Sequence, residues 1–192
     1  MPCFICVPKI TKALQQSDTI INKNQRKFLI QKKPQPPDLR AQIKLQKSGQ
    51  PIRPILNNRN APGYKISKVL VKKLNNAINL KNHYTVKDSI TLANEQIKIN
   101  IYENHRMVTF DIKVLYVNIP IGQTLEIANN LIMENNIEQE KNTDKPTLDT
   151  ILKQNYFAFD DNIYQPEKGI SMGSPITNII AEIFLQDLET NT

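Results

Sequence analysis

The run from Arg106 to Asn118 constrains the fold of this chain more than any other segment. It reads R-M-V-T-F-D-I-K-V-L-Y-V-N, and its many β-branched and other apolar residues predict a strand. Asp111 is the only acid in the run. Because an ionised carboxylate is costly to bury without a partner, an acid in such a strand needs a reason, either a functional role or local capping at a strand end.

The charge of the chain divides at the same place. The 192 residues carry 25 Lys and Arg and 18 Asp and Glu, for a net charge of +7. Residues 1–109 hold 20 bases and 5 acids, whereas residues 110–192 hold 5 bases and 13 acids. The first part is therefore net +15 and the second net −8, so the modest total charge is an average over a basic part and an acidic part.

The composition, with 40% hydrophobic and 22% charged residues, is typical of a globular protein. No apolar run approaches the ~20 residues of a membrane helix. We therefore expect no membrane partner and an intracellular location, with nucleus and cytoplasm not distinguished.

Periodicity predicts the remaining elements. Residues 11–40 read as a solvated helix followed by a proline-rich connector, and residues 39–55 as a basic hairpin that turns at Ser48-Gly49. Apolar residues at helical spacing predict three further helices, over 67–80, from a Thr124 cap to Ile132, and after a Ser174 cap with Pro175 at the first position. A short helix over 147–154 and a hairpin over 155–165 lie between the last two.

Four segments, in this order, resemble reverse transcriptases of the Penelope-like retroelements. The hairpin segment L-R-A-Q-I-K-L-Q-K-S-G-Q-P-I-R-P-I resembles the family's fingers, and V-K-D-S (Val86 to Ser89) resembles a short signature that follows them. F-D-I-K-V-L-Y-V-N-I-P (Phe110 to Pro120) resembles motif A, and G-I-S-M-G-S-P-I-T-N (Gly169 to Asn178) resembles motif B. Each match alone is weak, but four in the family's order make a strong signal.

The resemblance implies an RNA-directed DNA polymerase that uses two Mg²⁺ ions, an RNA template, a DNA primer and deoxynucleoside triphosphates. Asp111 would be the first catalytic carboxylate and a metal ligand, and the carbonyl of Ile112 would complete the coordination. Tyr116 would be the steric gate that excludes a ribose 2′-hydroxyl. On the other interpretation, Asp111 is a capping acid and Tyr116 is ordinary core.

The resemblance also implies residues that hold the nucleotide and the nucleic acid. Arg53 would bind the triphosphate, and Met172 and Gly173 would lie at the nascent base pair, where a glycine lets the backbone approach closely. Lys44 and Lys47 would contact phosphates or the nucleic-acid backbone. Both lysines can equally be solvated residues of an exposed strand.

The second source of carboxylates in this family is an aromatic-x-Asp-Asp hairpin after motif B. Phe159-Asp160-Asp161 imitates it, but this tripeptide precedes motif B and reads as a local turn. The chain ends at Thr192, directly after the predicted motif B helix. We therefore expect an N-terminal fragment that binds Mg²⁺ weakly and cannot polymerise alone, and whose motif A strand is an uncovered apolar edge.

The sequence thus predicts an α+β chain that forms the fingers and the first half of an antiparallel-sheet palm of a right-hand polymerase. The expected organisation is a polar N-terminal extension over residues 1–38, a fingers-like region over 39–106 and a partial palm over 107–192. A non-catalytic basic protein that binds nucleic acid is the alternative function.

Overall fold

The computed structural model describes residues 6–16, 23–78, 80, 86–134 and 144–191, and these form an α+β fold, as expected. Within this part the helices are α1 (Cys6–Gln16), α2 (Lys23–Leu29), α3 (Tyr64–Ala77), α4 (Ser89–Gln96), α5 (Leu115–Asn118), α6 (Ile121–Glu134), α7 (Asp144–Lys153) and α8 (Thr177–Thr190). The strands are β1 (Asp38–Ile43), β2 (Ile52–Asn57), β3 (Phe157–Phe159) and β4 (Asn162–Tyr164).

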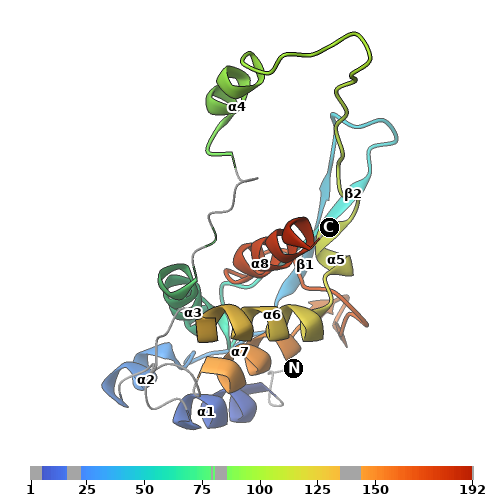
Figure 1. The fold of residues 1–192 in the computed structure, drawn as a ribbon. Coiled ribbons are helices and arrows are strands. Elements are labelled where there is room, and N and C mark those ends of the chain that lie inside the picture. Colours follow the sequence, from blue (N-terminus) through green and yellow to red (C-terminus); the bar gives the residue numbers. More distant parts are fainter. Residues whose placement is uncertain (1–5, 17–22, 79, 81–85, 135–143, 192) are drawn as a thin grey trace.

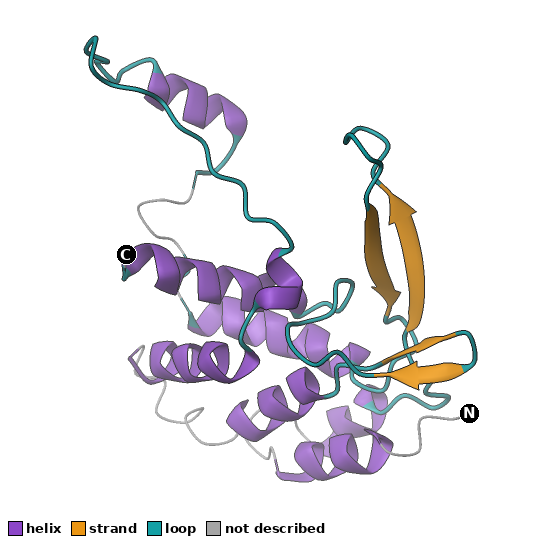
Figure 2. Ribbon diagram, turned by 90° about the vertical axis from the view of Figure 1, so that its right-hand side faces the viewer, coloured by secondary structure: helices purple, strands orange, loops and turns teal. Residues whose placement is uncertain are grey.

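The four strands form one mixed sheet in the order β2-β1-β3-β4. β1 and β2 are antiparallel, with Gln42 opposite Arg53, and their hairpin turns near Gly49 as predicted. β3 and β4 form the second predicted hairpin. A short parallel pairing of Asp38 with Ala158 joins the two hairpins. Figure 2 shows the strands at one side of the helices, with the β1–β2 hairpin projecting beyond them.

The predicted helical periodicity is confirmed where it forms the core. Each of α3, α6 and α8 buries one apolar stripe, and these stripes pack together with residues of α1 and α7 in a single cluster. The buried members of that cluster in the three helices are Ile66, Leu70, Leu74, Leu125, Ala128, Ile132, Ile179, Ile180, Ala181 and Ile183. α3 ends before Ile78, which is also buried. Figure 1 shows these helices side by side in the lower part of the molecule.

The strand predicted over residues 106–118 is wrong. Residues 106–112 have no regular secondary structure, and Leu115–Asn118 form the short helix α5, which begins after Val114 in the left-handed conformation. A strand is stabilised by hydrogen bonds to a neighbour, and no strand of the described chain pairs with this segment. The segment therefore exposes its apolar side chains, and Phe110 is 93% exposed.

Two predicted helix starts are also wrong. α6 begins at Ile121, so Thr124 lies within it, and its hydroxyl donates to the carbonyl of Pro120 at 2.9 Å. α8 begins at Thr177 with Ile176 at the N-cap, later than the predicted Ser174. At the start of α8 it is the backbone carbonyl of Ser174 that accepts from the amide of Thr177, and the Thr177 hydroxyl donates to the carbonyl of Ser171. Local sequence does not distinguish such bonds from those of a cap.

The N-terminal segment is less solvated than predicted. α1 packs against α7 and buries Ile10, Ala13 and Leu14. By contrast, α4 buries no residue, and Figure 1 shows it apart from the other helices. None of the helices in the described ranges has the length and apolar character that a membrane span needs.

The core at α8 gives a first prediction. Ile180 is fully buried, so Ile180→Ala should lower the free energy of unfolding by about 2–5 kcal/mol through lost burial and a cavity. Leu188 lies on the same helix but is 48% exposed, so Leu188→Ala should cost less than about 1 kcal/mol. Urea denaturation of the two variants measures the difference. Equal losses would contradict the burial of Ile180.

Candidate functional site

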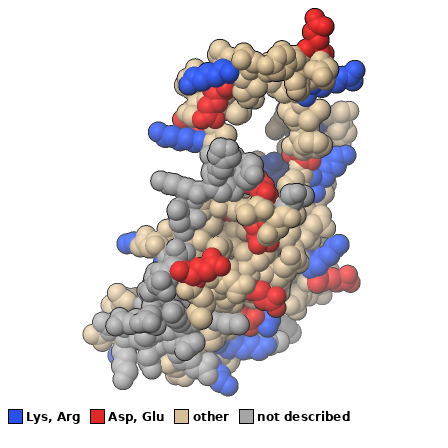
Figure 3. All heavy atoms as spheres, viewed as in Figure 1, with Lys and Arg blue, Asp and Glu red and all other residues tan. Residues whose placement is uncertain are grey.

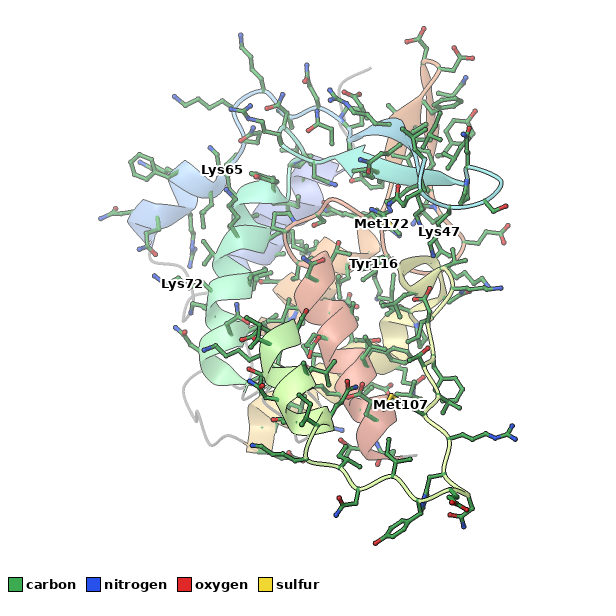
Figure 4. All side chains as sticks on the ribbon, turned by 90° about the horizontal axis from the view of Figure 1, so that it is seen from above. Lys47, Lys65, Lys72, Met107, Tyr116 and Met172 are labelled. Atoms are coloured by element: carbon green, nitrogen blue, oxygen red, sulfur yellow. The ribbon has the colours of Figure 1, made fainter. Side chains whose placement is uncertain are left out.

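Three of the four segments that carry the resemblance lie together. The loop 169–176 runs between α5 and β2, and backbone hydrogen bonds join it to both. The amide of Ile170 donates to the carbonyl of Tyr116 at 2.8 Å, and the amide of Leu56 donates to the carbonyl of Met172 at 2.8 Å. The motif A-like segment, the motif B-like loop and the basic hairpin are therefore one assembly (Figure 4).

Two glycines allow this close packing. Gly169 and Gly173 have φ angles of +77° and +108°, which L side chains rarely adopt. A Cβ at position 169 would overlap the backbone of Val117, and one at 173 would overlap the carbonyl oxygen of Leu56. The contact with Leu56 requires glycine at 173 whether or not a base pair binds there.

Tyr116 joins the motif A-like segment to the start of α8. Its ring is half-buried against the core, and its hydroxyl donates to Oδ1 of Asn178 at 3.3 Å. Asn178 is the last residue of the motif B-like segment. The side chain is thus held at the junction of the two segments, where Figure 4 shows it near Met172 and Lys47.

Asp111 lies at the surface, which differs from the expected acid within a strand. Its side chain is 83% exposed, and Oδ2 lies 3.6 Å from Nζ of Lys47 in the β1–β2 turn. An ion pair this exposed contributes at most about 1 kcal/mol. The ion pair matters for the arrangement of the site, because it places a cation of the hairpin next to the candidate catalytic carboxylate.

The other predicted site residues lie around this pair. Arg53 is exposed on β2, Lys44 is half-buried at the end of β1, and Ile112 is 52% exposed beside Asp111. Figure 3 shows Lys and Arg atoms spread around the margin of this face, and several Asp and Glu atoms over its central part. The described side chains thus place cations along the hairpin and a carboxylate facing them.

The described residues do not fit a complete two-metal site. In the described ranges, no group of three or more His, Cys, Asp and Glu could hold a metal ion. The ammonium of Lys47 lies 3.6 Å from Asp111 and repels a cation. Mg²⁺ needs several oxygen ligands, so Asp111 and the carbonyl of Ile112 form only part of a site.

The Phe159-Asp160-Asp161 hairpin has the local turn that the sequence predicts. Asp160 and Asp161 have φ angles of 47° and 58° and connect β3 to β4. Two positive φ values in a two-residue loop are those of a type I′ turn, in which Asp is common. Both carboxylates are exposed at the tip, so turn geometry accounts for this Asp pair.

The fourth segment, V-K-D-S, forms the start of α4. Asp88 is the N-cap, and its Oδ1 accepts from the amide of Thr91 at 2.8 Å. This hydrogen bond to the Thr91 amide lowers the pKa of Asp88 from its usual value. The segment is thus a capping sequence, and the structure does not bring it to the other three.

Asn155, which sequence reasoning missed, positions the motif B-like loop. It is buried, its Nδ2 donates to the carbonyl of Gly169 at 2.8 Å, and its Oδ1 accepts from the amide of Ser171 at 3.1 Å and from the Ser171 hydroxyl. A polar residue between a helix and a hairpin reads as an ordinary loop residue, so no sequence signal could have identified it.

A small pocket lies beside this loop, between the starts of α3 and α8. Its lining includes Asn58, Ser67, Asn155, Ser171 and the Tyr156 ring, whose buried hydroxyl has no hydrogen-bond partner among the described residues. None of the predicted site residues lines this pocket. The candidate site is instead an open surface between the hairpin, α5 and the loop.

Comparisons with family models and with curated proteins found no match for this chain.

The glycine contact gives a second prediction. Gly173→Ala should lower the free energy of unfolding by about 2 kcal/mol or more, because the methyl group meets the Leu56 carbonyl oxygen and φ is positive. Gly122→Ala is the matched control, since Gly122 lies in α6 with open space around it. This change should raise the free energy of unfolding by about 0.5–1 kcal/mol, because alanine favours a helix more than glycine does. Thermal unfolding of both variants checks the sign. A neutral Gly173→Ala would contradict the close approach.

The Asp88 cap gives a third prediction. The pKa of Asp88 is lower in the folded protein than its ordinary value of 3.8. The cap therefore stabilises α4 fully when the pH is above that ordinary value, and this stabilisation is lost as the pH falls through the lowered pKa. NMR Cα shifts of α4 should therefore lose helical character in acid. Asp88→Asn should retain the cap without this pH dependence, whereas Asp88→Ala should lack the cap at every pH. Identical titrations for all three proteins would contradict the capping role.

Proposed function

We propose that this chain provides the fingers and the first part of the palm of a retroelement reverse transcriptase, most similar to those of Penelope-like elements. What supports the proposal is one observation: three segments that resemble parts of one polymerase active site, and that lie far apart in the sequence, are joined by direct contacts. The contacts are two backbone hydrogen bonds, Ile170 to Tyr116 and Leu56 to Met172, together with the Tyr116–Asn178 hydrogen bond and the Lys47–Asp111 ion pair.

Within this proposal, each side chain has a role that fits its surroundings. Tyr116 is half-buried against the core and its hydroxyl donates to Asn178, which positions the ring as a residue that excludes a 2′-hydroxyl requires. Arg53 and Lys47 lie on the projecting hairpin, from which they can reach a triphosphate. Asp111 supplies one of the carboxylates, and the described residues alone would not complete the coordination of a metal ion.

The exposed segment before α5 is consistent with the same proposal. Met107, Val108, Phe110 and Ile112 are each more than half exposed, and the segment has no strand partner in the described part of the chain. Apolar side chains exposed along an extended backbone favour the addition of a strand. In the proposed polymerase, the hairpin that carries the second carboxylates would pair there, and residues 106–112 would then become the expected palm strand.

The test supplies that hairpin. The chain is joined to the following segment of a Penelope-like reverse transcriptase, and primer extension is measured on an RNA template with Mg²⁺ and deoxynucleotides. We expect extension by the joined protein but not by the 192 residues alone. Asp111→Asn should lower the rate at least ~100-fold, since a metal ligand contributes several kcal/mol, and Tyr116→Ala should raise ribonucleotide incorporation.

The matched control for Asp111 is Asp160→Asn, which removes another exposed carboxylate, in the β3–β4 turn. That variant should extend primers at the unmodified rate. Extension that is lost equally in both variants, or that survives Asp111→Asn, would reject the assignment of Asp111.

The second candidate function is non-catalytic nucleic-acid binding, which the density of basic residues favours. Residues 26–73 hold 13 Lys and Arg and a single acid, Asp38. On this candidate, affinity for RNA or DNA falls steeply with added salt and is unchanged by Asp111→Ala. A complex that is insensitive to salt would reject it.

A further inference from the structure

We propose that the outer surface of α2 and α3 binds single-stranded nucleic acid, through phosphate contacts of lysines and stacking of a base on Phe28. This surface, the α2–α3 surface, consists of Lys27, Phe28, Lys65, Lys68 and Lys72. It is separate from the candidate site described above, and the inference does not depend on the polymerase proposal.

The lysines of α3 follow one stripe of the helix. Lys65, Lys68 and Lys72 are spaced by three and four residues, so they lie on one face over about 10 Å of the helix axis. The opposite face, with Leu70 and Leu74, is buried in the core. Figure 4 shows Lys65 and Lys72 on the side of the molecule away from Lys47, Tyr116 and Met172.

α2 extends this stripe with an exposed aromatic ring. Nζ of Lys65 donates to the carbonyl of Phe28 at 3.0 Å, which fixes the end of α2 against α3. The ring of Phe28 is nevertheless 77% exposed, and Lys27 beside it is exposed. Nζ of Lys68 lies 4.9 Å from the centroid of the Tyr64 ring, which holds that cation on the same helix.

The two helices of this surface carry bases and no acids. Neither α2 nor α3 contains an acid, and the one acid of residues 26–73, Asp38, lies on β1. In the described part of the chain, neither Lys27 nor Lys72 makes an ion pair. Lysines that repel one another along a helix are stabilised by an extended polyanion, which neutralises several of them at once.

Two features favour a single strand of nucleic acid over other polyanions. Phe28 is the only large apolar side chain that α2 and α3 expose, which is too little to insert into a membrane surface. A lone exposed aromatic ring among cations is instead the arrangement on which unpaired bases stack. Base pairs in a duplex do not offer their faces to such a ring, so the affinity for a duplex should be lower.

The test measures fluorescence anisotropy of a labelled 20-nucleotide single-stranded RNA with the whole 192-residue chain, over a range of salt concentrations. We expect the triple variant Lys65→Gln, Lys68→Gln, Lys72→Gln to bind at least ~10-fold more weakly. Its slope of log affinity against log salt should fall by about 2, which corresponds to three lost phosphate contacts on a single strand.

A matched control removes the same charge elsewhere. Lys98, Lys153 and Lys168 are exposed and lie outside both the α2–α3 surface and the candidate site, so their triple change to Gln should alter the affinity less than ~3-fold. Equal weakening by both triple variants would show a general charge effect and overturn the proposal. No weakening by either would overturn it as well.

The stacking of a base is tested separately. Phe28→Ala should weaken binding of the single strand ~5-fold or more while leaving duplex binding unchanged. Ile97→Ala, a change at an 82% exposed apolar residue after α4, should alter neither. Equal binding of single strand and duplex by the unmodified chain, or no effect of Phe28→Ala, would overturn the preference for a single strand. Failure of primer extension would leave every one of these outcomes unchanged.

Discussion

The packing of the 169–173 loop between β2 and α5 is the constraint on which the candidate site depends. At both ends of this loop the backbone approaches another backbone so closely that a Cβ would overlap it, at Val117 and at Leu56. Hydrogen bonds from the Ile170 and Leu56 amides then fix the loop in register with both neighbours. Through these contacts one loop holds both the hairpin that carries the cations and the segment that carries the carboxylate.

The helical core provides the support for that loop. α8 begins at Thr177, with three residues between it and the loop, and is buried along one face. Asn155, which follows α7, donates to the carbonyl of Gly169 in the loop. The parts that project from the core, namely the β1–β2 hairpin, α4 and the extended segment before α5, bury few side chains. The site is thus built where a well-packed body meets exposed segments that can contact large partners.

Local sequence was a reliable guide to helices with an apolar stripe and to turns with their own residue signal, although it misplaced the starts of α6 and α8 and did not indicate α4. The apolar spacing of Leu70, Leu74 and Ile78 predicted α3, because a helix satisfies its own hydrogen bonds and needs only one apolar stripe. The Asp160-Asp161 turn was likewise predictable, because two Asp residues tolerate positive φ in a short hairpin. The strand predicted over 106–118 was not formed, because strand pairing depends on a neighbour that lies elsewhere in the chain or outside it.

The sequence by itself determined the division of charge, the helical stripes and the order of the segments that resemble a reverse transcriptase, since each depends only on residue type and spacing. Only the tertiary structure decided that Asp111 is exposed beside Lys47, that Asn155 holds the motif B-like loop and that V-K-D-S is a helix cap. The physical reason is that the first two depend on contacts between residues far apart in the sequence, and the third on one hydrogen bond that forms only in the backbone geometry of a helix start. Neither kind of contact produces a periodic pattern of residues in the sequence.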